Sequence, residues 1–216
     1  MSRVKLLNFI CILALFFSST AYADTYIPVD SLLYDDFRFL EAEGIITTSM
    51  LSTLPISRLE GARLTTEALN NASIGNSSRI DRVVSRLEKE FVRELDIAKP
   101  AYLKPADTAH LQYAYSDRES FFAKKNRDGL SVRRGNNTFL DLTSRFDSRY
   151  VGLAVKPELS IYDDATQLTL KKAYLLANLG REEFMVGKES AWWGPGRNGS
   201  ILLSTNAEPL TTLKIS

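Results

Sequence analysis

The 216-residue sequence has little cysteine, little histidine and almost no net charge. Its single cysteine, Cys11, lies in an apolar stretch near the N-terminus, so the rest of the chain has no thiol for a disulfide. With one histidine, His110, and no further thiol, a zinc site is excluded. A formal net charge of +1 without a basic stripe argues against a nucleic-acid partner. We therefore expect no metal, no cofactor and no nucleic acid.

The N-terminus has the pattern of a secretory signal peptide. Arg3 and Lys5 precede an apolar run from Leu6 to Phe17, and Ala21-Tyr22-Ala23 matches a small-x-small cleavage site. The run is about 12 residues long, well short of the roughly 20 that a membrane-spanning helix requires. We expect residues 1–23 to be removed on export, so that the mature chain begins at Asp24.

Residues 24–99 have the periodicity of helices. Apolar residues recur every three or four positions in three segments, which begin near Ser31, Ser57 and Ser77. The third segment, Arg79–Ile97, is the most strongly amphipathic, and a solvated helix face explains its alternating charges. Prolines 100 and 105 then mark a boundary. The pattern predicts a small helical module on the periplasmic side.

Beyond position 105 the apolar period changes to two, which is typical of strands. The strands are separated by short polar turns at 147–149 and 163–165 and by a long polar loop at 118–137. We expect the short turns to lie on one side of the sheet and the long loops on the other. Export, the lack of cysteine and long alternating strands favour an outer-membrane β-barrel over a soluble sheet with one wet face. The candidate strands are 108–117, 140–147, 151–161, 168–176, 183–189, 199–204 and 209–216.

The last candidate strand is cut off at Ser216, without a terminal aromatic residue. About seven strands with an open end cannot close a barrel, because unpaired backbone groups in lipid cost several kcal/mol each. We therefore expect residues 105–216 to be the first part of a longer barrel. The predicted fold class is α+β, a small N-terminal helical bundle followed by the antiparallel strands of an incomplete outer-membrane β-barrel.

The most unusual segment is Gly187–Ser200, which contains both tryptophans of the chain, Trp192 and Trp193. Their rings can stack on sugars, and the side chains around them can bond sugar hydroxyls. A second interpretation is an aromatic anchor with charged groups paired in the barrel lumen, and the usual role of barrel aromatics favours it. The candidate binding residues are Trp192, Trp193, Arg197, Asn198, Lys188 and Glu189, and the candidate turn is Gly194, Pro195 and Gly196.

This segment resembles a motif of the Wzi-type capsule assembly proteins of Gram-negative outer membranes. The matching residues are Gly187-Lys188-Glu189-Ser190, Trp193-Gly194-Pro195-Gly196-Arg197-Asn198-Gly199, Leu202-Leu203-Ser204, Asn206, Ala207 and Pro209. The upstream pattern Leu40-Glu41, Gly44-Ile45-Ile46 and Leu54-Pro55-Ile56-Ser57-Arg58 is also similar to the start of that family. The resemblance implies an exported outer-membrane barrel with a periplasmic helical bundle, which acts as a lectin-like anchor of capsular polysaccharide and contacts outer-membrane lipid.

Catalytic motifs are not apparent, and we expect the protein not to be an enzyme. The sequence has no nucleophile elbow, Walker loop or dinucleotide-binding glycine pattern. Pairs of carboxylates that a glycosidase would need are better explained by acidic turns and lumen charge. Two alternatives to a capsule anchor remain: a porin-like channel and a soluble periplasmic protein that processes polysaccharide.

Overall fold

The computed structural model describes residues 23–72, 77–96, 101–118, 128–148, 150–179, 182–194, 196, 200 and 203–215. The expected signal peptide, apart from Ala23, lies outside these residues, as do Pro195, Arg197 and Asn198 of the tryptophan motif. Within the described residues, helices come first in the chain and are followed by a six-stranded antiparallel sheet and a two-stranded one. The α+β fold class is therefore confirmed.

The helices pack around one apolar core. They are α2 (Leu33–Ala42), α3 (Arg58–Asn71), α4 (Ser78–Glu90) and α5 (Val92–Leu95). The Ser57 hydroxyl caps α3 by accepting a hydrogen bond from the Glu60 amide at 3.2 Å. Gly44 follows α2 with a φ of +71°, the left-handed conformation that commonly ends a helix. The predicted third helix is interrupted at Phe91, whose ring is buried in the core beside Phe37.

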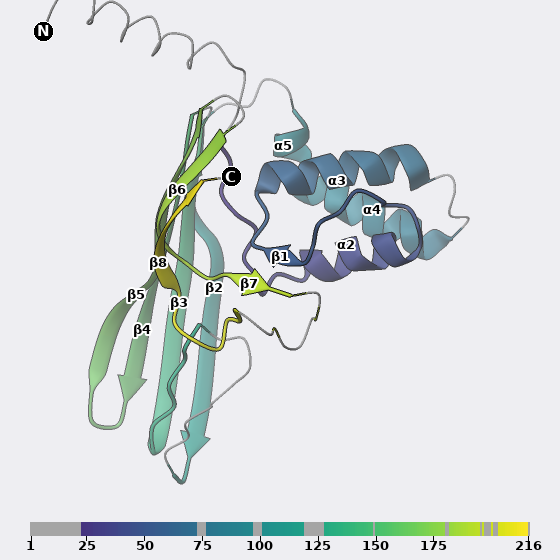
Figure 1. The fold of residues 1–216 in the computed structure, drawn as a ribbon. Coiled ribbons are helices and arrows are strands. Elements are labelled where there is room, and N and C mark those ends of the chain that lie inside the picture. The colour runs from purple at the N-terminus through teal and green to yellow at the C-terminus, as the bar shows by residue number, and fades with distance from the viewer. Residues whose placement is uncertain are drawn as a thin grey trace, which may run out of the picture.

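The large sheet has the order β2-β3-β4-β5-β6-β8 and is antiparallel throughout. In the described part of the chain, β2 and β8 each pair with a single strand, so the sheet is open, as expected for an incomplete barrel. Helices α2 to α5 lie on one side of it (Figure 1). The strands are β2 (Tyr102–Ser116), β3 (Gly135–Asp147), β4 (Val151–Tyr162), β5 (Thr166–Leu179), β6 (Glu182–Glu189) and β8 (Leu210–Ile215).

Three features of the sheet differ from the prediction. Strand β3 begins at Gly135, inside the predicted loop 118–137. Strand β2 begins at Tyr102 and passes through Pro105, where its register with β3 shifts; an edge strand tolerates proline because its outward N–H needs no partner. The turns at 147–149 and 163–165 connect successive antiparallel strands, so they lie at opposite ends of the sheet. The expectation that they share one side was wrong, and turn 163–165 lies at the same end as the long β2–β3 loop.

A short ribbon joins the helical module to the chain after β6. It pairs β1 (Thr53–Leu54) with β7 (Trp192–Trp193). The Gly194 amide extends the pairing by donating to the Ser52 carbonyl at 2.8 Å. The strand predicted at 199–204 lies partly outside the described residues, and Leu203 makes an isolated bridge to Trp193.

The two faces of the large sheet differ sharply in polarity. One face carries rows of apolar side chains that are neighbours in register and largely exposed. The other face carries charged and polar side chains and packs against the helices. None of the helices in the described ranges has the length and hydrophobicity of a membrane-spanning helix. One apolar row runs Leu103, Phe146, Leu153, Leu175, Val186 and Leu213, and a second runs Leu111, Leu140, Leu159 and Leu168.

Candidate functional site

The segment before α2 connects the helical module to the polar face of the sheet. The Thr25 amide donates to Asp147 Oδ1 at 2.7 Å, and the Tyr26 amide donates to the Tyr174 hydroxyl at 2.9 Å. The rings of Tyr26 and Tyr174 lie 5.4 Å apart and form a small buried cluster with neighbouring strand residues. The helical module therefore rests on side chains of β3 and β5.

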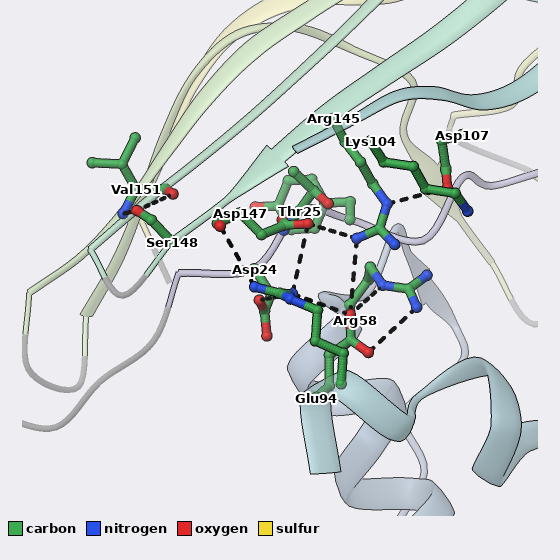
Figure 2. Close-up of polar contacts among 12 residues, drawn as sticks. Asp24, Thr25, Arg58, Glu94, Lys104, Asp107, Arg145, Asp147, Ser148 and Val151 are labelled. Carbon is green, nitrogen blue, oxygen red and sulfur yellow. Dashed lines mark hydrogen bonds and ion pairs between the residues drawn. The ribbon is translucent and has the colours of Figure 1, made fainter. Parts of the chain in front are cut away.

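A buried network of ions reinforces this contact. Figure 2 shows the side chains of Arg58 and Arg145 both pointing toward Glu94, with Asp107, Asp147 and Asp24 around them. Arg58 of α3 bonds Glu94 of α5 at 2.7 Å, and Arg145 of β3 lies 3.8 Å from the same carboxylate. Arg145 also pairs with Asp147 at 2.5 Å. Since the side chains of Arg58, Glu94 and Arg145 are at most 7% exposed, the network is largely removed from solvent.

The charge of Glu94 is set by this environment. Burial alone would raise the pKa of Glu94, but the hydrogen bond and charge of Arg58, together with the charge of Arg145, hold the pKa below its ordinary value. Burial would lower the pKa of Arg58, but the carboxylates of Glu94 and Glu90 hold it above its ordinary value. Arg58 and Glu94 are therefore both ionised at neutral pH, and it is a charged carboxylate that faces Arg145 of β3.

A second polar cluster is centred on Asp128, at the end of the long β2–β3 loop. Asp128 has a φ of +51°, accepts a hydrogen bond from the Ser190 hydroxyl at 2.5 Å and donates its amide to the Thr205 carbonyl at 2.8 Å. Lys172 of β5 lies 3.5 Å from its carboxylate and 2.9 Å from Glu189. Asp128 thus lies on the polar face of the sheet, where it contacts the chain on both sides of β7.

Between the helical module and the sheet lies a cavity of about 370 Å³. Its walls come from the segment before α2, from α3 and from the polar faces of strands β2 to β6. A smaller cavity of about 60 Å³ lies toward Asp128 and shares Asp30, His110 and Lys156 with the larger one. In the described residues, no three His, Cys, Asp or Glu side chains are grouped so that they could hold a metal ion.

The structure separates the two tryptophans of the motif. Trp192 is 2% exposed and belongs to the apolar core of the helical module, with its indole Nε1 donating to the Gly194 carbonyl at 3.1 Å. Trp193 is 48% exposed on the same short strand. Gly194 has a φ of +153°, which suits a residue without a Cβ at this bend. Of the two indole rings, that of Trp193 is therefore the one accessible from solvent.

The charged residues of the motif have different partners. Glu189 is buried and pairs with Lys172 at 2.9 Å. Lys188 is partly exposed, and its Nζ lies 3.7 Å from Glu208. Gly196 is exposed. Trp193, Lys188 and Gly196 are thus accessible to solvent, whereas Trp192 and Glu189 are held inside.

The sequence did not point to Glu94, Arg145, Lys156 or Asp128, and it included Arg58 only in the upstream pattern that resembles the family. Each lies in an ordinary-looking charged segment, and the partners of each come from distant parts of the chain. The only local signal was the alternation along the strands, which predicts a polar face but not which charges meet on it.

The fold and these contacts define a class: a barrel-type antiparallel sheet with an apolar outer face and a helical module docked on its polar face. The chain matches the family model described as capsule assembly protein Wzi over residues 104–216. The chain belongs to this family, which confirms the resemblance and supports a role in capsule assembly. Searches of curated proteins and of solved structures find no match.

Proposed function

We propose that this protein is exported by way of a signal peptide, residues 1–23, and acts in the outer membrane to attach capsular polysaccharide at the cell surface. The observation that carries the proposal is the pair of apolar rows on one face of a sheet whose other face is charged, together with membership of the capsule assembly family. In a barrel the side chains of each strand point alternately to the lipid and to the lumen, which gives the sheet one apolar face and one charged face.

In this proposal, residues 24–99 form a periplasmic module and the strands from 105 onward contact outer-membrane lipid. The short turn at 148–150 lies where the module meets the sheet, because Ala23 bridges Ser148 and Arg93 of α5 lies 3.3 Å from Asp24. The long β2–β3 loop lies at the opposite end of the strands. The end that meets the module has a short turn and the opposite end has the long loop, as in barrels with short periplasmic turns and longer external loops, although the short turn 163–165 shares that opposite end.

We further propose that the tryptophan motif contributes to lectin-like recognition through Trp193. A half-exposed indole can stack on a sugar ring, and Lys188, with Arg197 and Asn198 of the same motif, would supply hydrogen-bond donors. Trp192 and Glu189 would support this surface from inside, since one packs in the core and the other pairs with Lys172.

The test is a complementation experiment in an encapsulated Gram-negative strain that lacks its own member of the family. Cells that express the chain should retain polysaccharide on the surface, whereas the deletion strain should release it to the medium. The protein should sediment with the outer membrane. Soluble periplasmic protein, or retention no better than in the deletion strain, would contradict the proposal; ion conductance without retention would favour a channel.

A further inference from the structure

The apolar face of the large sheet is sorted by side-chain type along its strands. Tyr113 and Tyr115 follow Leu111 at alternate positions of β2, so all three lie on this face, and all three are exposed. The two tyrosines lie near the end of β2 that leads into the long loop. At the opposite end of the sheet, Tyr150 is exposed in the turn between β3 and β4. In the described part of this face, tyrosines therefore lie at the margins, and the middle is aliphatic.

Polar groups begin where the tyrosines are found. Asp117, whose carboxylate is exposed, comes two positions after Tyr115. The Tyr113 hydroxyl donates to Asn136 Oδ1 at 2.6 Å, so this phenol ends among polar groups at the same margin. At the other margin the turn at 148–150 meets the helical module. The apolar face therefore has a polar limit at each end.

The stretch between these limits matches the thickness of a bilayer. On β4, Val151 and Ile161 both lie on the apolar face, ten residues apart, and the exposed Asp163 follows two positions later. At about 3.4 Å per residue, the two apolar residues are about 34 Å apart along the strand. A strand tilt of about 40° reduces this length to about 26 Å along the membrane normal, close to the apolar band of about 25 Å in outer-membrane barrels.

The sorting of side chains distinguishes lipid from a protein partner. Contacts between proteins concentrate tyrosine and tryptophan near the centre of the buried patch. Tyrosines at a bilayer lie at the membrane–water boundary, because the ring enters the apolar region while the hydroxyl stays with water and headgroups. The centre of this face carries exposed aliphatic side chains such as Leu140 and Leu168. The arrangement therefore fits lipid better than a second sheet or a second copy of the chain.

We propose that Tyr113 and Tyr115 mark the boundary between the bilayer and the external solvent, and that Tyr150 marks the periplasmic boundary. Lipid headgroups contact the tyrosine hydroxyls, and acyl chains cover the aliphatic side chains between the two boundaries. The strands then cross the membrane with a tilt of about 40°, and the turn at 148–150 lies at the level of the periplasmic headgroups. The inference rests on the proposed function, because it assigns depths to the lipid contact proposed there.

The experiment measures the depth of nitroxide labels on single-cysteine variants of the full chain, in vesicles of phosphatidylethanolamine and phosphatidylglycerol. Cys11 lies in the expected signal peptide, so the mature chain has no other thiol to label. Power saturation compares collisions of the label with oxygen, which concentrates in lipid, and with a water-soluble nickel chelate. We expect the ratio of oxygen to nickel collisions to be several-fold higher at Leu140 than at Tyr115 and Tyr150, and to be lowest at Met50 of the helical module.

The labels at Leu140 and Met50 separate this inference from the proposed function. Equal ratios at Leu140 and Tyr115, or a ratio at Tyr115 as low as that at Met50, would overturn the boundary and leave the membrane location. A ratio at Leu140 as low as that at Met50, in folded protein, would contradict the membrane location, and this inference with it. If the label at Tyr115 prevents folding, a label at Tyr113 gives the same test.

Discussion

At the scale of single residues, Glu94 is the position where the helical module and the sheet share a buried charge. Breaking a buried ion pair by removing one partner costs about 3–5 kcal/mol. We expect Glu94→Gln to cost about 3 kcal/mol, at the low end, because Glu90 remains 2.9 Å from Arg58. Urea denaturation followed by circular dichroism measures this loss. Glu88→Gln, on the exposed face of α4, should change stability little; equal effects would contradict the role of Glu94.

The lowered pKa of Glu94 also predicts how stability depends on pH. In the folded state the pKa of Glu94 is lower than its ordinary value of 4.5. Such a carboxyl stabilises the fold at pH values above 4.5. This contribution is lost as the pH falls through the lower, folded-state pKa. Denaturation curves from pH 6 downward should therefore show a steeper loss of stability in the wild type than in Glu94→Gln. Parallel curves would show that Glu94 does not titrate differently in the two states.

Gly61 in α3 is required by packing rather than by backbone conformation. A Cβ at this position would lie 2.7 Å from the Phe91 ring and 2.8 Å from Ile27 Cδ1, both of which are buried. Replacing glycine by alanine inside a helix ordinarily gains about 1 kcal/mol, whereas overpacking costs about 1–3 kcal/mol. We expect Gly61→Ala to destabilise by about 1 kcal/mol on thermal melting. Asn70→Ala, exposed on the same helix, should stabilise slightly, and the same sign for both would argue against the close contact.

At the scale of elements, the short β1–β7 ribbon links the helical core to the end of β6 through Trp192. Truncating a large buried aromatic residue costs about 3–5 kcal/mol. We expect Trp192→Ala to destabilise the helical module by that amount and to expose the segment after β6 to protease. Trp193→Ala, at a half-exposed position on the same strand, should leave melting within about 1 kcal/mol.

The two tryptophan variants also separate structure from binding in the retention assay. Trp193→Ala should release polysaccharide while the protein remains folded and present in the outer membrane at wild-type level. Loss of retention only in Trp192→Ala, together with loss of protein, would indicate that the motif is purely structural. The two substitutions are adjacent and remove the same side chain, so each is the control for the other.

The sequence predicted the elements better than their contacts. Local signals were sufficient to predict the three helices: Ser57 caps the start of α3, and Gly44 marks the end of α2. The apolar period of two located the central strands. The break at Phe91 was missed because the helical period continues through it and a tertiary contact with Phe37 decides the geometry. Pro105 was taken as a boundary since proline usually ends a strand, but at an edge it costs no hydrogen bond.

The candidate site was less predictable, because the partners of its charges lie far apart in the chain. Arg145 and Glu94 are 51 positions apart, and no spacing rule connects a strand residue to a helix residue at that distance. The motif identified Trp192 and Trp193 as unusual, but two adjacent strand residues point to opposite faces. Which of the two would be buried depended on the pairing of β7 with β1, which the sequence does not encode locally.

At the scale of the whole molecule, the proposed location in the outer membrane depends on the exposed apolar rows. Leu168 is 76% exposed in register with Leu159 and would face lipid in the proposed arrangement. A lysine on the lipid face of a barrel costs about 2–4 kcal/mol near the bilayer midplane and less near its edges. We therefore expect Leu168→Lys to reduce the amount of protein recovered in the outer-membrane fraction, because the charged side chain cannot be solvated there.

Met50→Lys is the matched control for this experiment. Met50 is 78% exposed, almost the same as Leu168, but it lies in the helical module, which we place in the periplasm. The substitution adds the same charge to an equally exposed apolar position and should leave membrane recovery unchanged. If both variants insert normally, the apolar rows contact something other than lipid; if both fail, added charge alone impairs folding or export. Only a loss confined to Leu168→Lys supports a lipid-facing sheet, since solvent would accept a lysine equally at both sites.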